Sequence, residues 1–429
     1  MLRGKDRVSY YFIRILTIPI MFLPNKIIHL LGKFLGIICF YILIRLRKKT
    51  LSNLAIAKDL NFSNEEILKI GKKSFQNLAI NILEYPKLSF KKKFSKLIVC
   101  ENPEIADDIY KKKIGIIFFC GHQSNWEVLF LDGTSRMNGI AIGRPIKNKK
   151  LYKWIIKIRE KNGGKIITPK NALREGLKCL KKGVFLGIVG DQGMPESSYH
   201  YPFFGTRAWT TTAPALLSYK TNSPIIVATT KRENNRYKIK YSDPIWPNLE
   251  KPLESEVRRI MDESLKILEK SIKKRPHEWL WQHNRWKQQN PKLISKRYRH
   301  DTILIILPLE KEEFFKINNH LEILFKIYSK GFLTILCPED FSRDLARTDH
   351  EIIFYKSYEN SLLNDYRFKL VYNFTNFKKI NSHYLKYSAY EVITIKKMLD
   401  DIYKKDIQID INNLSEIFKH SIYRKALKI

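Results

Sequence analysis

The chain has 429 residues, of which 44% are hydrophobic, so its composition excludes an intrinsically disordered protein and allows more than one domain. It carries 78 Lys and Arg against 42 Asp and Glu, and the formal net charge of +36 indicates a polyanionic partner: a nucleic acid, an anionic membrane, or a phosphorylated or acidic substrate. A Lys-, Asn- and Ile-rich proteome is an equally good source for part of this excess. The cysteines are widely spaced and contain no CxxC, which favours free thiols in a reducing cytosol over a disulfide framework or a zinc cluster.

Two apolar runs dominate the N-terminus. They are residues 10–24 and residues 27–44, and the second is interrupted by His29 and Lys33 and followed at once by RLRKK. A spanning helix needs about 20 mostly apolar residues, and no small-residue cleavage site of a removable signal peptide is present. We therefore expect residues 1–48 to anchor the chain to a membrane, as one span or as a helix in the interface. If both basic flanks are cytoplasmic, the two runs form a shallow hairpin. The alternative is a buried helical hairpin of an ordinary core.

From residue 50 the sequence predicts amphipathic helices, one of which starts with a capping box of Ser63 and Glu66. From residue 114 the pattern changes to short apolar strands alternating with helices, which predicts a mixed, largely parallel α/β sheet covered on both faces. We assign this sheet to a domain of residues 49–297. The predicted elements are strands 114–120, 139–143, 165–169 and 184–190, a hairpin around Asn234 and Asn235, and helices 171–183 and 254–276.

A second, smaller α/β unit is predicted for residues 298–429, with strands at 301–309, 331–340 and 368–376. It contains neither GxGxxG nor GxxxxGK[ST], so no motif specifies a nucleotide site. Its role is open. One hypothesis is that it makes the protein a bifunctional enzyme or a scaffold for the neighbouring pathway step.

In sheets of this kind the ligand site lies at the carboxyl ends of the strands. The residues that follow the predicted strands are His122 after the first, Arg144 after the second, Thr168 after the third, and Asp191 with Gln192 after the fourth. A histidine, an arginine and an aspartate that reach one rim from different strands predict an active site.

The segment FFCGHQSNWEVLF, residues 118–130, contains His122 and Glu127. In a continuous helix these two side chains would point about 140° apart. If His122 lies in a loop and the helix begins at Ser124, the imidazole can fold back onto the carboxylate and act as a general base near neutral pH. The alternative is structural, because Ser124 and Glu127 also match a capping box, in which Glu127 binds only a backbone N–H.

Four sequence blocks in one order resemble the lipid A late acyltransferases, the lauroyl and myristoyl transferases of lipopolysaccharide assembly within the lysophospholipid acyltransferase superfamily. The resemblance covers roughly residues 5–290, and two features depart from it: the polar QSN after His122 and the extra tail from residue 298. The H-x4-[DE] pattern is weak alone and specific in combination with the other blocks. The blocks are GHQSNWE, GRPIKN, DQGMPESSYHYPFFGTRAWTTTAPALLSYKTNSPII and PHEWLWQHNRWK.

The resemblance implies a glycerolipid acyltransferase-like fold and a role for each matching residue. His122 would be the general base on an acceptor hydroxyl, and Glu127 would orient it and stabilise its cation. Arg144 would stabilise the oxyanion or bind a substrate phosphate, and Asp191 would complete the catalytic site. Phe203, Phe204 and Gly205 would lie on a loop that walls the acyl channel. The full set implied to bind substrate is Arg159, Gln192, Phe203, Phe204, Gly205 and Arg207, in which the two arginines are second-choice basic partners.

Each of these roles has a structural alternative. Arg144 is also explained as a strand-end charge, Asp191 as a helix cap, and Phe203 and Phe204 as core residues. Cys120 is a rival nucleophile next to the site, although a thiol at the end of an apolar strand is more often buried and inert.

The reaction implied by the resemblance moves an acyl chain from an acyl carrier protein thioester to a hydroxyl of a Kdo2-lipid IVA-like acceptor, an anionic glycolipid. It would take place at the cytoplasmic side of the inner membrane and would need neither a metal nor a cofactor. The absence of GxSxG from the sequence argues against a serine acyl-enzyme. One rival is an acyltransferase that uses acyl-CoA on a glycerophospholipid or glycolipid. A rival of another class is a basic nucleic-acid-binding protein, against which the apolar N-terminus and the lack of a known basic motif argue. We therefore expect no nucleic-acid partner.

Overall fold

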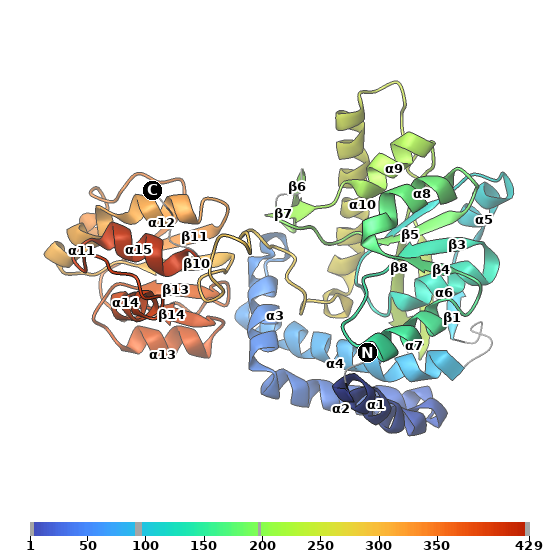
Figure 1. Ribbon diagram of the computed structural model, residues 1–429, viewed down its shortest axis with the longest axis horizontal. Helices are drawn as coiled ribbons and strands as arrows, with labels where there is room; N and C mark the ends of the chain where they lie inside the picture. Colours follow the sequence, from blue (N-terminus) through green and yellow to red (C-terminus); the bar gives the residue numbers. More distant parts are fainter. Residues whose placement is uncertain (1–3, 91–96, 196–198, 425–429) are drawn as a thin grey trace.

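The structure is a computed structural model that describes residues 4–90, 97–195 and 199–424. Its described residues form a seven-stranded sheet in the order β1-β9-β8-β2-β5-β3-β4 and a five-stranded sheet in the order β12-β11-β10-β13-β14. Figure 1 shows the two sheets on opposite sides of helix α3 (Ile44–Ile56). The expectation of largely parallel sheets covered by helices is confirmed for both. The boundaries proposed at residues 49 and 298 stay a prediction.

The seven-stranded sheet is parallel except for the antiparallel hairpin of β8 and β9, whose turn residues Asn234 and Asn235 have φ of 47° and 60°. Its strands are β1 (Ile98–Cys100), β2 (Ile117–Cys120), β3 (Gly139–Ile142), β4 (Lys165–Ile167), β5 (Phe185–Val189), β8 (Ile225–Glu233) and β9 (Arg236–Tyr241). Strands β6 (Tyr199–Phe203) and β7 (Thr206–Thr210) form a separate hairpin. The predicted strands and hairpin are confirmed, with shorter bounds.

Alternating residues of β2 face two different cores: Ile117 and Phe119 pack into one buried cluster, and Phe118 packs into another. The sheet is therefore covered on both faces, as predicted. The covering helices are α5 (Glu104–Lys111), α6 (Glu127–Arg136), α7 (Lys149–Arg159), α8 (Ala172–Leu180), α9 (Ala213–Thr221) and α10 (Leu253–Lys274). Short 3-10 helices occur at Lys58–Leu60, Pro169–Asn171, Pro276–Glu278 and Glu339–Phe341.

Helix α2 (Asn25–Ile42) lies along α4 (Asn64–Phe90) in Figure 1, and α1 (Gly4–Phe22) also contacts α4. The predicted capping box opens α4: the Ser63 N–H donates to Glu66 Oε2 at 2.9 Å and the Glu66 N–H to Ser63 Oγ at 3.2 Å. His29, which interrupts the apolar run, is buried and its Nε2 lies 2.6 Å from Glu84 Oε1 on α4. A polar residue within α2 thus serves to dock the helix.

The opposite face of α2 is apolar and exposed. Leu30 and Phe34 are 69% and 62% exposed, and Leu35 and Ile37 also face outward. Among the described residues α2 is the one helix long and apolar enough to cross a membrane, and 22% of it is buried in the structure. This is weak evidence for a membrane anchor, because length and composition alone support it.

The five-stranded sheet is entirely parallel, and its strand order reverses between β10 and β13, as in doubly wound folds. Its strands are β10 (Thr302–Ile306), β11 (Phe332–Pro338), β12 (Glu351–Tyr355), β13 (Leu370–Asn373) and β14 (Glu391–Ile393). Its helices are α11 (Lys311–Asn318), α12 (Leu321–Ile327), α13 (Lys379–Lys386), α14 (Ile395–Tyr403) and α15 (Leu414–Ile422). We call residues 302–422 the C-terminal unit.

Gly36 tests how closely α2 packs on α4. A Cβ at this position would lie 2.4 Å from Gln76 Cα and 2.6 Å from Gln76 N, which are backbone atoms that cannot rotate away. Helix propensity alone predicts that Gly36→Ala stabilises the protein by about 1 kcal/mol. We expect the opposite sign, a loss of about 1–3 kcal/mol, because α2 must shift to admit the methyl group. Thermal unfolding in detergent measures it, with Leu35→Ala on the exposed face as the near-neutral control; a raised melting temperature for Gly36→Ala would contradict the packing.

Candidate active site

His122 and Asp191 meet because β2 and β5 are neighbouring parallel strands that end at the same edge. His122 Nδ1 lies 2.7 Å from Asp191 Oδ1, and the His122 backbone N–H donates to Asp191 Oδ2 at 2.7 Å. The residue before the histidine must be small, since a Cβ on Gly121 would lie 2.9 Å from Leu268 and 3.1 Å from Asp191 Oδ2. The loop after β2 is therefore tied to the loop after β5 by both main-chain and side-chain contacts.

The Asp191 carboxylate is buried, with 1% of the residue exposed, and accepts a further hydrogen bond from Trp279 Nε1 at 2.9 Å. Burial alone raises the pKa of Asp191, but the charge and hydrogen bonds of His122 and the indole N–H of Trp279 outweigh burial and hold the pKa below its usual range. An ionised carboxylate can only accept hydrogen bonds, so Nδ1 of His122 carries the proton. The Nε2 lone pair is then available as a base.

Glu127 is held by a different partner. Its carboxylate accepts from Arg159 of α7, with Arg159 Nε to Glu127 Oε2 at 2.8 Å and Arg159 Nη2 to Glu127 Oε1 at 2.5 Å. The hydroxyl of Tyr85 donates to Oε2 at 3.3 Å. The prediction that Glu127 orients His122 is thus not what the structure shows, since Asp191 makes that contact.

The capping-box alternative for this segment is also wrong. Helix α6 begins at Glu127, and Ser124 has φ of 49°, outside helical geometry. The Ser124 hydroxyl is buried and has no hydrogen-bond partner among the described residues. The segment between β2 and α6 is a loop, as predicted for a catalytic His122. The loop, however, directs the Glu127 side chain toward Arg159 of α7 and not toward His122.

A cavity of about 440 Å³ opens at this edge of the sheet. His122 and Glu127 line it, with Arg144 from the loop after β3. The Arg144 side chain is exposed and makes no ion pair with any carboxylate of the described residues. The amide Nε2 of Gln192 lies 3.2 Å from His122 Nδ1 and 3.5 Å from His122 Nε2. The rest of the wall is largely apolar, including Phe118, Leu129, Phe130, Ile142, Phe185 and Ile188. Such a cavity suits an apolar chain that ends at a polar group.

The residues expected to wall the acyl channel lie elsewhere. Phe204 and Gly205 form the tight turn of the β6–β7 hairpin, with φ of 47° and 74°, and neither lines the cavity. Phe203 is fully buried against Trp279 and Trp286, at ring-centroid distances of 5.6 and 6.0 Å. The core alternative is therefore correct for both phenylalanines. Arg207 is exposed and lines another, smaller cavity together with Gly205.

Two site residues were missed from the sequence, although both belong to the quoted block PHEWLWQHNRWK. Trp279 donates to Asp191, and His283 stacks on His122 with ring centroids 6.0 Å apart and planes 8° apart. Burial, and next the nearby charge of Lys287, lower the pKa of His283, so its ring is neutral at neutral pH. Its buried Nε2 has no partner among the described residues. Only the clustering of aromatic residues and histidines in the block hinted at these contacts.

Comparison with known proteins identifies the family. The sequence profile of the bacterial lipid A biosynthesis acyltransferases matches residues 5–288. The chain belongs to this family. It is also 24% identical over 282 residues to a lipid A biosynthesis lauroyltransferase of Escherichia coli (strain K12), an alignment that covers 64% of this chain and 90% of the relative. The protein is therefore an acyltransferase, and the C-terminal unit lies outside the matched region.

The chemistry available at this edge fits acyl transfer. Among the described residues no three His, Cys, Asp or Glu side chains converge to hold a metal ion. What the cavity offers is the imidazole of His122, a buried carboxylate behind its Nδ1, and the guanidinium of Arg144. A base, its orienting carboxylate and a cation for a developing negative charge are the groups that a hydroxyl attack on a thioester requires.

Two isosteric variants separate the roles of the carboxylates. Asp191→Asn removes the acceptor that fixes the His122 tautomer, so we expect the turnover number to fall by about 10²–10⁴-fold with a folded protein. Glu127→Gln weakens the pairing with Arg159, so we expect a smaller loss of turnover and a lower melting temperature. Acyl transfer kinetics and thermal unfolding of both variants measure this. If Glu127→Gln loses more turnover than Asp191→Asn, the assignment of Asp191 to His122 is wrong.

Proposed function

We propose that the protein transfers a fatty acyl chain from an acyl carrier protein thioester to a hydroxyl of a phosphorylated lipid A precursor similar to Kdo2-lipid IVA. The observation that carries this proposal is the His122–Asp191 pair at the wall of a largely apolar cavity. The family match supports the acceptor class, and the name of the relative suggests a lauroyl chain.

In this mechanism Nε2 of His122 takes the proton of the acceptor hydroxyl as its oxygen attacks the thioester carbonyl. The new C–O bond forms a tetrahedral oxyanion, which Arg144 stabilises from the cavity wall. Collapse of the oxyanion breaks the C–S bond, and the imidazolium returns its proton to the leaving thiolate. Asp191 stabilises the imidazolium between these two steps, because its carboxylate stays ionised when buried against His122.

Arg159 contributes differently from Arg144. Its guanidinium pairs with the Glu127 carboxylate through Nε and Nη2, so much of its charge is neutralised within the pair. We propose that the pair fixes α6 against α7 and thereby positions the wall that receives the acyl chain. The side-chain amide of Gln192 lies within 3.5 Å of both imidazole nitrogens of His122, and we propose that this contact helps to position the ring.

The exposed apolar faces of α1 and α2 support attachment to a membrane, with the active site on the cytoplasmic side of the inner membrane. On α1 the exposed apolar side chains are Val8, Phe12 and Ile15, at 71%, 63% and 67% exposure. They are as exposed as the apolar side chains on the outer face of α2. Helices with one apolar face and basic flanks lie in the membrane interface. The net charge of +36 suits both an anionic membrane and the acidic donor protein.

A mass-shift assay tests this function. Membranes containing the protein are incubated with Kdo2-lipid IVA and a panel of acyl carrier protein thioesters of different chain length. We expect the acceptor to gain one acyl group, and His122→Ala to lower the rate by about 10³-fold or more, since the base is removed. If acyl-CoA supports the same rate of acyl transfer as the acyl carrier protein thioester, the proposed choice of donor is wrong. A folded, membrane-bound protein that forms no product with any thioester would refute the lipid A acceptor.

Cys120 provides a test of direct transfer. Its thiol is buried at the end of β2, and burial strongly raises its pKa, so it is protonated and unreactive at neutral pH. We expect Cys120→Ala to keep turnover within a few-fold of the parent protein, and we expect no acyl-enzyme by intact mass spectrometry. Loss of turnover in a stably folded Cys120→Ala variant, together with a covalent acyl adduct in the parent, would favour a cysteine nucleophile.

A further inference from the structure

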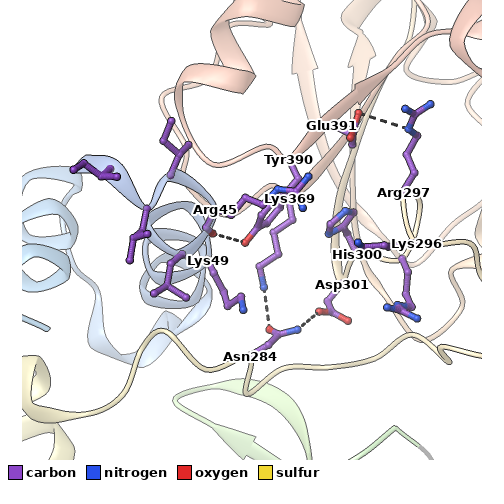
Figure 2. A pocket seen from close by; sticks show the side chains of 15 residues that line it. Arg45, Lys49, Asn284, Lys296, Arg297, His300, Asp301, Lys369, Tyr390 and Glu391 are labelled. Atoms are coloured by element: carbon purple, nitrogen blue, oxygen red, sulfur yellow. Dashed lines mark hydrogen bonds and ion pairs between the residues drawn. The ribbon is translucent and has the colours of Figure 1, made fainter. Parts of the chain in front are cut away.

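A second cavity, of about 940 Å³, lies where the C-terminal unit meets the rest of the chain. Its walls come from the junction of α2 and α3, from the segment that leads into β10, and from the amino ends of β13 and β14 (Figure 2). Much of this lining, from residue 296 onward, lies beyond the residues 5–288 that match the family. We call it the junction pocket.

The junction pocket is strongly basic. Its lining includes six lysines and arginines and two carboxylates. Both carboxylates are already engaged: Asp301 accepts from the Asn284 amide and the Gln288 N–H, each at 2.7 Å, and Glu391 lies 3.8 Å from Arg297. The basic residues are Arg45, Lys49, Lys296, Arg297, Arg299 and Lys369.

Lys369 is the buried centre of this charge, with 3% of the residue exposed. Its ammonium group donates to Asn53 Oδ1 at 3.2 Å and to Asn284 Oδ1 at 3.1 Å, and it has no ion pair with any carboxylate of the described residues. Burial lowers the pKa of Lys369 to about 8, against a partial raise from the nearby Asp301 carboxylate and with a smaller lowering from Lys49. Asp301 is linked to Lys369 through Asn284 rather than paired with it, and a buried cation without a directly paired anion is costly.

Lys49 adds a second cation to the same wall. It is half-buried, burial lowers its pKa, and it forms no hydrogen bond or ion pair within the described part of the chain. Figure 2 shows the Lys49 and Lys369 side chains reaching toward Asn284 from α3 and from the C-terminal unit. Cations from two parts of the fold thus converge on one space.

The rim of the junction pocket is apolar. Ile42, Leu43 and Ile44, at the end of α2, line it and are 69%, 45% and 51% exposed. These residues continue the exposed apolar face of α2. A ligand that fills the pocket therefore meets both cations and the exposed apolar side chains of residues 42–44, which suits an amphiphile with an anionic head group.

The junction pocket also adjoins the active site through consecutive residues. His283 lines the catalytic cavity and stacks on His122, while Asn284 lines the junction pocket and holds Lys369. A head group fixed in the pocket would therefore lie beside the cavity that contains the base.

We propose that the junction pocket binds the phosphate groups of an anionic lipid, with its acyl chains against residues 42–44, and that the C-terminal unit thereby completes the recognition of the acceptor. This rests on the proposed function. Phosphate is the anion that lysine and arginine clusters recognise in lipid head groups. The pocket selects the ligand, while His122 and Asp191 act on it.

The test measures binding to the full-length protein in non-ionic detergent micelles, without an acyl donor. The probes are a tetra-acylated glucosamine disaccharide bisphosphate, its dephosphorylated form, and inorganic pyrophosphate. The variant is Lys49→Gln with Arg299→Gln, and the control is Arg174→Gln with Lys178→Gln, an equal charge change on α8, where both residues are exposed.

We expect the bisphosphate lipid to bind the parent and the control equally and the junction variant about ten-fold or more weakly. The dephosphorylated lipid and pyrophosphate should bind the parent much more weakly. Equal binding by junction variant and control, or equal binding of the dephosphorylated lipid, would overturn the proposal. If pyrophosphate binds as tightly as the lipid, the ligand of the junction pocket is a soluble phosphate compound and not a lipid.

Two further measurements separate this inference from the proposed function. His122→Ala should bind the bisphosphate lipid as the parent does, because it leaves the junction pocket intact. Where acyl transfer occurs, the junction variant should raise the KM for the acceptor about ten-fold with little change in kcat. Lipid binding without any acyl transfer would refute the proposed function and leave the assignment of the junction pocket intact. Acyl transfer with an unchanged KM in the junction variant would refute the pocket assignment and leave the proposed function intact.

Discussion

The buried carboxylate of Asp191 accepts hydrogen bonds from the His122 ring, the His122 backbone and the Trp279 indole, and the active site depends on these contacts. A buried charge is costly unless its hydrogen bonds are complete. Here the donors come from the loop after β2 and from the segment after α10, so satisfying one carboxylate joins two distant parts of the chain. The same contacts fix the tautomer that leaves Nε2 of His122 available.

The segment that supplies Trp279 and His283 is itself held by other elements. Asn53 of α3 donates to the carbonyls of Trp281 and His283 at 2.8 and 2.6 Å, and Ser74 of α4 donates to the Trp279 carbonyl at 3.1 Å. The tryptophans pack with Phe203 in one core cluster. Helices α3 and α4 therefore position the residues behind His122, whereas α1 and α2 present the exposed apolar face.

Parallel strands share a carboxyl edge, so sequence reasoning expected His122, Arg144 and Asp191 at one edge of the sheet, and the structure places them there. Sequence reasoning could not choose the carboxylate that serves His122. Glu127 is near in sequence, whereas Asp191 is 69 residues away and becomes a neighbour only because β5 pairs with β2 while β3 and β4 lie beyond β5. The buried roles of Phe203 and Phe204 were equally hidden, since an aromatic pair before a glycine fits a hairpin turn and a channel loop alike. Strands β1 and β14, of three residues each, carry too little periodicity to define them by pattern alone.

The C-terminal unit meets the rest of the chain through the amino edge of its sheet. Parallel sheets with this strand order usually bind ligands outside the carboxyl ends, near the reversal between β10 and β13. Asp301 and Lys369 instead precede those two strands, so they lie at the opposite edge. There Lys369 is bonded to Asn53 and Asn284, and Asn284 is bonded to Asp301. A displacement of the C-terminal unit would pull on Asn284 and hence on His283, its neighbour in the chain, which stacks on His122. The position of the C-terminal unit and the geometry around His122 are therefore coupled through Asn284 and through Asn53, which donates to the His283 carbonyl.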